Sequence, residues 1–253
     1  MKILSNYIWF FCLLLAISCK NEPLATSVVK TERIPVNSSV KAKNSITEYI
    51  EPYKQQLNLT LDSTLAYNPE LLSKNDGDLN TALGNLMADA VMEQANPIFK
   101  SREGKNIDFV LLNHGGIRAE IPKGNITSRT AYQLMPFENE IVIVELSAKK
   151  LKEMLAYLED AKTAHPIGGI KIKADKNYRI TEAEINGEPI NEERTYFVAT
   201  SDYLQQGGDN MKFFANPLNL YSTNYKIRNA LIDYFKKVDT IKTEIDNRYT
   251  RKK

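Results

Sequence analysis

Six aromatic or polar side chains lie in three loops that also carry glycine or proline. They are Asn113 and Arg118 in the first loop, Phe137 and Asn139 in the second, and Tyr203 and Asp209 in the third. Aromatic rings stack on nucleobases, and an amide matches the donor and acceptor edge of a base. A carboxylate accepts hydrogen bonds from sugar hydroxyls, and a guanidinium pairs with phosphate. The set predicts a site for a nucleotide or nucleoside.

Each of these residues also has a plainer interpretation. Phe137 follows a proline, where an aromatic side chain is often part of the core. The run Gly207-Gly208-Asp209 is typical of a turn, and Arg118 alone suits a surface ion pair of little energetic value. Asn113 alone suits a residue that satisfies backbone groups at a strand end. Only the combination favours a ligand site.

The three loops adjoin three short apolar runs, which predict buried strands. These runs are residues 109–112, 141–144 and 196–199. A buried strand that meets a polar loop places the loop side chains at a sheet edge, where ligands are commonly bound. We therefore expect the sheet to position the six side chains.

The spacing of apolar residues predicts three helices and two further β-elements. Helices are expected around residues 83–91, with Asn80 or Thr81 as the N-cap, around 151–158 after the cap Ser147, and around 227–235. Alternation predicts a half-buried strand at residues 57–61, and Asn186-Gly187 predicts a type I′ hairpin turn within residues 178–190. Helices and strands mix without a regular alternation, so the expected fold class is α/β (mixed α+β), with one layered domain.

The N-terminus is typical of a bacterial lipoprotein. An apolar run at residues 8–17 follows Lys2 and ends in Ala16-Ile17-Ser18-Cys19, which resembles a lipobox. We expect a signal peptide at 1–18, an acylated Cys19 with a flexible tether at 19–45, and the folded domain at 46–253. Because a signal opens the chain, we also expect residue 1 to be the natural start. An ordinary secretory signal and an uncleaved anchor are the alternatives; the lipoprotein interpretation predicts a lipid-anchored protein of the cell envelope, on its periplasmic or cell-surface face.

Composition argues against several classes of protein. The chain has 33 Lys and Arg against 31 Asp and Glu, and the small excess lies before residue 46, so we expect no nucleic-acid partner. Both cysteines, Cys12 and Cys19, lie in the first twenty residues, and His114 and His165 are the only histidines. We expect no disulfide, thiolate metal site or multi-histidine metal centre in the folded domain.

Five segments, in this order, resemble the C-terminal domain of the 5'-nucleotidase and UDP-sugar hydrolase family. They are LGNLMADA at 83–90, LNHGGIR at 112–118, LMPFENEIV at 134–142, GGIKI at 168–172 and YFVATSDYLQQGGDN at 196–210. In that family this domain recognises the nucleoside, and a separate N-terminal metallophosphatase domain holds two metal ions and performs hydrolysis. The resemblance covers the chain from about residue 78 onward and implies the same layered α/β fold.

The resemblance also implies a role for each of the six residues. Phe137 and Tyr203 would clamp the base from two sides. Asn139, with Asn113 as a second candidate, would read the base edge or support the loop. Asp209 would bind the ribose hydroxyls. Arg118 would bind the phosphate.

Four positions depart from the family pattern. Tyr203 stands where phenylalanine is more usual, which keeps the ring and adds a hydroxyl. His114 stands where relatives have glycine. Thr81 and Ala82 stand where some relatives place a second phosphate-binding arginine, which predicts either a weaker grip on phosphate or a grip supplied by another chain.

The sequence shows no metallophosphatase half. Its D-x-H and G-N-H-[DE] motifs are absent, and Asn113-His114 lacks the flanking residues of the second. We therefore expect no catalytic residue, metal or other cofactor in this chain, with a divalent metal pair only in a partner metallophosphatase. The first hypothesis is the recognition subunit of a split 5'-nucleotidase, active in nucleotide catabolism together with that partner. The alternatives are a stand-alone envelope lipoprotein that binds nucleosides or nucleotides without hydrolysis, and a structural module.

Overall fold

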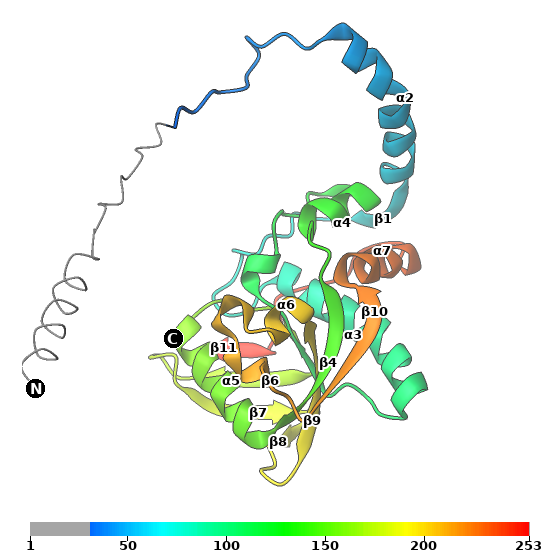
Figure 1. The fold of residues 1–253 in the computed structure, drawn as a ribbon. Coiled ribbons are helices and arrows are strands. Elements are labelled where there is room, and N and C mark those ends of the chain that lie inside the picture. Colours follow the sequence, from blue (N-terminus) through cyan, green and yellow to red (C-terminus); the bar gives the residue numbers. More distant parts are fainter. Residues whose placement is uncertain (1–30, 253) are drawn as a thin grey trace, which may run out of the picture. The chain divides into compact units, whose positions relative to one another are not determined.

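The structure, a computed structural model, describes residues 31–252 (Figure 1). The chain divides into two units, residues 1–49 and 50–253. The predicted signal peptide, Cys19 and the first part of the tether lie outside the described residues. Residues 31–43 contain neither helix nor strand, and the predicted domain start at residue 46 falls inside the first described helix. Within the described range, no helix is both long and apolar enough to cross a membrane.

Helix α2 (Asn44–Leu61) contradicts the strand predicted at residues 57–61. The leucines at 57, 59 and 61 do alternate, but the apolar residues before them recur three or four positions apart. No residue of α2 is buried, and Leu57 and Leu59 are 55% and 74% exposed. A strand needs a neighbouring strand for its backbone hydrogen bonds, whereas a helix satisfies them internally. Without a sheet partner, the helical alternative prevails.

A five-stranded sheet forms the centre of the domain. Its strand order is β10-β4-β9-β2-β5, and only β2 and β9 run parallel. The strands are β2 (Phe109–Leu111), β4 (Glu140–Ser147), β5 (Ile167–Gly168), β9 (Thr195–Ser201) and β10 (Asn219–Lys226). The predictions of strands at 109–112, 141–144 and 196–199 are confirmed.

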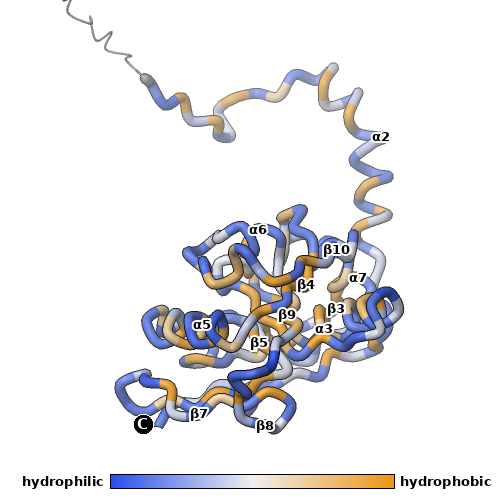
Figure 2. Tube along the Cα trace, turned by 60° about the horizontal axis from the view of Figure 1, so that its bottom comes forward, coloured by the Kyte–Doolittle hydropathy of each residue, from blue (hydrophilic) through white to orange (hydrophobic). Residues whose placement is uncertain are grey.

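Alternate residues of this sheet enter two separate cores. Ile141 and Ile143 of β4 join a core formed with helices α3 (Ala82–Glu103) and α7 (Ile227–Lys237). Val144 and Leu146 join a second core with helix α5 (Ala148–Ala161) and a smaller sheet. Figure 2 shows the central strands as a hydrophobic layer. Because both faces are covered, the runs at residues 109–111 and 141–144 are apolar throughout rather than alternating.

The helix predictions are confirmed, including two caps. Thr81 caps α3 by accepting a hydrogen bond from Gly84 N, and Ser147 caps α5 by accepting from Lys150 N. The shorter helices border the loops of interest. They are α4 (Ser128–Leu134), α6 (Asp202–Gln205), and the 3₁₀ turns η1 (His114–Gly116), η2 (Gly208–Asn210) and η3 (Lys212–Phe214).

Two smaller sheets complete the architecture. β1 (Thr64–Asn68) pairs antiparallel with β3 (Gly124–Thr127). The other has the order β11-β6-β7-β8, from β6 (Ile170–Ala174), β7 (Ile180–Ile185), β8 (Glu188–Pro189) and β11 (Tyr249–Arg251). Asn186 and Gly187 join β7 to β8 with φ values of 54° and 81°. Both are positive, as a type I′ turn requires, so the hairpin prediction is confirmed.

Candidate functional site

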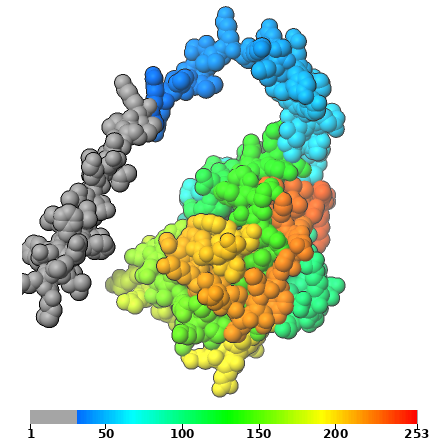
Figure 3. All heavy atoms as spheres, in the orientation of Figure 1, coloured from blue at the N-terminus to red at the C-terminus, as the bar shows by residue number. Residues whose placement is uncertain are grey.

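Strand direction brings the three predicted loops to one edge of the central sheet. β2 and β9 run parallel, so the loops that follow them leave from the same edge. β4 runs antiparallel to β9, with Ile141 opposite Ser201, so the loop that precedes β4 ends at that edge too. In Figure 3 the gold surface of the segment after β9 borders the green surface near α4. The sheet therefore gathers segments about 90 residues apart in sequence.

A cavity of about 300 Å³ lies between these loops. Its walls contain all six side chains that the sequence singles out, together with two glycines. The lining residues are Asn113, Gly115, Gly116, Arg118, Phe137, Asn139, Tyr203 and Asp209. The cavity thus combines two aromatic rings, two amides, one guanidinium and one carboxylate, which are groups suited to binding and orienting a polar, ring-containing ligand.

Phe137 forms one wall of the cavity. Its ring is 39% exposed, and the guanidinium carbon of Arg118 lies 5.8 Å from the ring centroid. The loop is tied to helix α7, because Ile227 N donates to Asn139 O over 3.0 Å. An exposed ring on a tethered loop is available for stacking, which argues against the plainer interpretation of Phe137 as a core residue.

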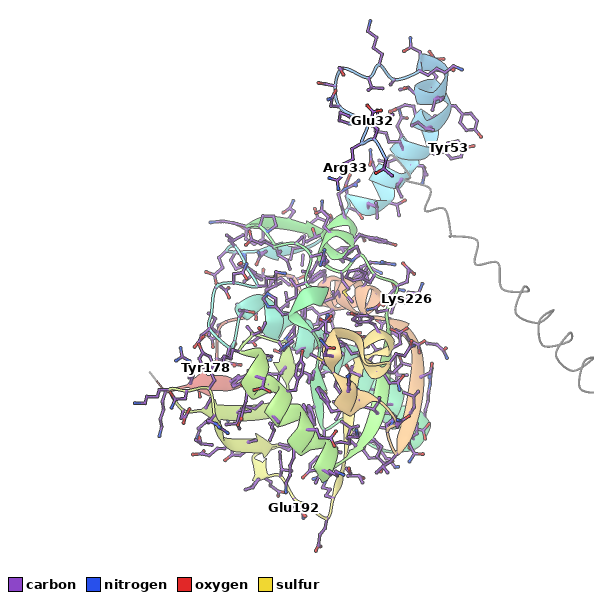
Figure 4. All side chains as sticks on the ribbon, turned by 60° about the vertical axis from the view of Figure 1, so that its left-hand side comes forward. Glu32, Arg33, Tyr53, Tyr178, Glu192 and Lys226 are labelled. Carbon is purple, nitrogen blue, oxygen red and sulfur yellow. The ribbon has the colours of Figure 1, made fainter. Side chains whose placement is uncertain are left out.

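The sequence did not predict a cluster of charged residues next to Phe137, formed by Glu138, Lys226 and Arg228. The Glu138 carboxylate accepts hydrogen bonds from Lys226 and Arg228, and Arg228 Nη1 also donates to Phe137 O over 3.2 Å. Lys226 lies at the junction of β10 and α7 (Figure 4). The Arg228 guanidinium lies 4.1 Å from the ring centroid of Tyr132, and its side chain is only 5% exposed.

This cluster holds Glu138 in its charged form. The hydrogen bonds from Lys226 and then Arg228 lower the pKa of Glu138 to about 2. The only local signal in the sequence is a carboxylate beside Phe137. Its partners lie about 90 residues further on, beyond the reach of any spacing rule.

Tyr203 and Asp209 form another part of the lining. The Tyr203 ring is 45% exposed, and its hydroxyl donates to Asp209 Oδ1 over 3.0 Å. Asn113 Nδ2 donates to Asp209 Oδ2 over 2.6 Å. Asn113 itself is buried, with 8% exposure. Its side-chain amide therefore orients the Asp209 carboxylate.

The loop after β2 rests on a buried histidine. His165 Nδ1 accepts a hydrogen bond from His114 N over 3.2 Å, and His114 Nδ1 lies 3.2 Å from Ala164 O. Burial, and to a smaller extent the nearby His114, lowers the pKa of His165 to about 4. Neutral His165 can accept at Nδ1, so it supports the loop that carries Asn113 and Arg118.

His114 and His165 are not part of a larger cluster of possible metal ligands in the described residues. No group of three or more histidine, cysteine or acidic residues between residues 31 and 252 is placed to hold a metal ion.

Comparison with known proteins gives the same domain type. Residues 63–216, more than half of the chain, match the family described as "5'-nucleotidase, C-terminal domain". The chain belongs to this family. The crystal structure of a 5'-nucleotidase precursor from Thermus thermophilus shares the fold, with a TM-score of 0.67 and 24% identity over 83% of this chain and 43% of that one.

Curated relatives are longer proteins. The chain is 28% identical over 209 residues to "Trifunctional nucleotide phosphoesterase protein YfkN" of Bacillus subtilis, covering 74% of this chain and 14% of that protein. It is 22% identical over 217 residues to "Protein UshA" of Escherichia coli, covering 82% of this chain and 37% of that protein. The chain thus spans less than half the length of each. The family resemblance and the α/β fold expected from the sequence are confirmed.

Proposed function

We propose that this chain is the nucleotide-recognition part of a split 5'-nucleotidase. The observation that carries the proposal is the single cavity lined by all six predicted side chains. Its volume of about 300 Å³ is at the lower end of the range for small-molecule sites. Phe137 and Tyr203 stack on the base, Asn139 reads its edge, Asp209 takes the ribose hydroxyls, and Arg118 binds the phosphate.

Hydrolysis is assigned to a metallophosphatase domain on another polypeptide. Three observations support this assignment. The family match concerns the C-terminal domain alone. The described residues assemble no metal ligands, and the sequence lacks the D-x-H and G-N-H-[DE] motifs. The partner would supply the divalent metal pair that activates water and stabilises charge on the phosphate, while this chain orients the nucleotide.

Calorimetric titration of the purified chain with AMP, adenosine and UDP-glucose tests the recognition role. We expect binding of at least one of them, and phosphate release from AMP only after a cognate metallophosphatase domain is added. Binding without any stimulating partner would favour the stand-alone nucleotide-binding lipoprotein. If the chain binds none of the three, the structural-module hypothesis is favoured. Phosphate release by the pure chain would contradict the assignment of hydrolysis to another polypeptide.

We also propose that Cys19 is acylated and anchors the chain in the bacterial cell envelope. The lipobox-like run ending at Cys19 supports this proposal. Two or more acyl chains give stable membrane attachment, whereas one gives only marginal binding. Radiolabelled palmitate should be incorporated into the wild-type protein and not into Cys19→Ser, and equal labelling of both would contradict the anchor.

A further inference from the structure

Every polar group of Asp209 has a partner within the protein. Its backbone N–H donates to the Tyr203 hydroxyl over 3.3 Å, and its carbonyl accepts from the Tyr157 hydroxyl over 3.0 Å. Its carboxylate accepts from Tyr203 at one oxygen and from Asn113 at the other. This residue has a positive φ of 50°, an uncommon conformation that the surrounding bonds maintain. The carboxylate is therefore held in one orientation at the cavity wall.

The carboxylate keeps unused acceptor capacity in this orientation. A carboxylate offers about four acceptor positions, two on each oxygen. Tyr203 occupies one position on Oδ1 and Asn113 one on Oδ2. One position on each oxygen is left, and these match the two adjacent hydroxyls of a ribose. A vicinal diol can bind without displacing either internal donor.

The Tyr203 hydroxyl makes two of the bonds that fix Asp209. It accepts from the backbone N–H and donates to the carboxylate of the same residue. The ring reaches this position because residue 208 is glycine, where a Cβ atom would lie 2.5 Å from Tyr203 Cε1. A phenylalanine ring would fill the same space and stack equally well, but it would make neither bond.

We propose that the Tyr203 hydroxyl is a positioning group that presets Asp209 for the 2'- and 3'-hydroxyls of a ribose. Tyr203 thus has two separable functions, with the ring holding the base and the hydroxyl setting the preference for ribose over sugars that lack the diol. This inference rests on the proposed nucleotide-binding function and deepens it. It assigns the selectivity for ribonucleosides to a hydroxyl that does not itself contact the sugar.

Calorimetric titration with adenosine and 2',3'-dideoxyadenosine separates these functions. We expect Tyr203→Phe to weaken adenosine binding about fivefold, the effect of one net hydrogen bond, and to change dideoxyadenosine binding less than about twofold. Asp209→Asn should abolish the preference for adenosine, and Tyr203→Phe added to it should have no further effect on that preference. Tyr67→Phe, which removes a hydroxyl outside the cavity lining, is the matched control and should behave as wild type.

The outcomes distinguish the inference from the proposed function. Equal weakening of both ligands by Tyr203→Phe, or no weakening of either, would overturn the positioning role while nucleotide binding stands. Binding of neither ligand by the wild-type chain would overturn the proposed function and this inference with it. Retention of the adenosine preference in Asp209→Asn would also contradict the inference.

Discussion

The two aromatic residues of the cavity are held in place by different physical means. The loop of Phe137 is tied by ions, because Glu138 beside it is bound by Lys226 and Arg228. Tyr203 is tied by its own hydroxyl to Asp209, whose other donors are the uncharged Asn113 and Tyr157. The strength of an ion pair depends on protonation and on salt concentration. The strength of a hydrogen bond from an uncharged donor depends mainly on its geometry.

Because of this difference, we expect the Phe137 side and the Tyr203 side of the cavity to respond to different solution conditions. Glu138 is 63% exposed, so salt screens its attraction to the two cations. The Tyr203 side depends on a buried amide and on the loop that His165 supports. We therefore expect the Phe137 side to respond to salt and strong acid. The Tyr203 side should respond to removal of the Tyr203 hydroxyl and to mild acid.

The largest expected effect comes from removing the rings themselves. Phe137→Ala and Tyr203→Ala should each weaken AMP binding by about 1–3 kcal/mol, the usual value for one stacked base. Because both rings contact one ligand, we expect the double variant to bind AMP too weakly for calorimetry. Tyr67→Ala, an exposed aromatic outside the cavity lining, is the control. Unchanged affinity in either single variant would show that its ring does not contact the base.

Mild acid should destabilise the protein through His165, which supports the loop that carries Asn113. Burial lowers the pKa of His165 from 6.5 to about 4 in the folded chain. Between these values the unfolded chain binds a proton that the folded chain does not, so stability falls as the pH falls. The shift corresponds to about 3 kcal/mol of unfolding free energy lost between pH 6.5 and 4.

Urea denaturation at several pH values measures this loss. His165→Asn keeps an acceptor for His114 N and removes the titration, so its stability curve should lack this component. His114→Asn is the comparison variant: because burial is the main cause of the low pKa of His165 and His114 only the second, this variant should retain most of the wild-type slope. A wild-type curve that is flat between the two pKa values would contradict the role of His165.

Replacement of Arg228 should loosen the Phe137 side. Arg228→Met removes the bond to Phe137 O and the contact with the Tyr132 ring, while it keeps much of the buried volume. We expect the unfolding free energy to fall by about 2 kcal/mol, and AMP binding to weaken because the loop is less ordered. Lys236→Met removes an exposed cation from the same helix and should change stability by less than about 0.5 kcal/mol. Equal effects of the two substitutions would show that Arg228 has no special role.

The smallest expected effect concerns Glu138. Its pKa falls from 4.5 to about 2 on folding, so its contribution to stability is complete above pH 4.5 and is lost as the pH falls toward 2. Wild type should be slightly more stable than Glu138→Gln near neutral pH in low salt. The difference should shrink in concentrated NaCl and vanish at strongly acidic pH. A difference that grows on acidification would have the wrong sign for this mechanism.

Local patterns in the sequence predicted helices α3, α5 and α7, strands β2, β4 and β9 and the β7–β8 hairpin, but not α4, β1, β3, β10 or β11. The caps Thr81 and Ser147 and the Asn186-Gly187 turn are confirmed because each depends on neighbouring residues alone. The strands before the first and third loops are also confirmed, since sheet partners are available for their apolar runs. The strand predicted at residues 57–61 was wrong, because alternating leucines describe a strand only when a sheet partner is available.

Prediction of the site was limited in the same way, because contacts between residues distant in sequence could not be predicted. The six side chains were chosen by their chemistry, and the structure places all of them around one cavity. The cluster of Glu138, Lys226 and Arg228 was missed, since an ion pair across 90 residues leaves no mark on local spacing. The Tyr203 hydroxyl was noted as an addition to the ring, but its bonds to Asp209 depend on how the segment folds back over Gly208.

The amino-acid sequence by itself determined which chemical groups the loops carry and where several of the strands and helices form, because hydrophobic period and turn chemistry act over a few residues. Only the tertiary structure decided that β2 runs parallel to β9 and β4 antiparallel to it. That pairing sends three loop ends to one sheet edge and so makes separate residues into one cavity. It depends on the simultaneous burial of both sheet faces, which no single segment specifies.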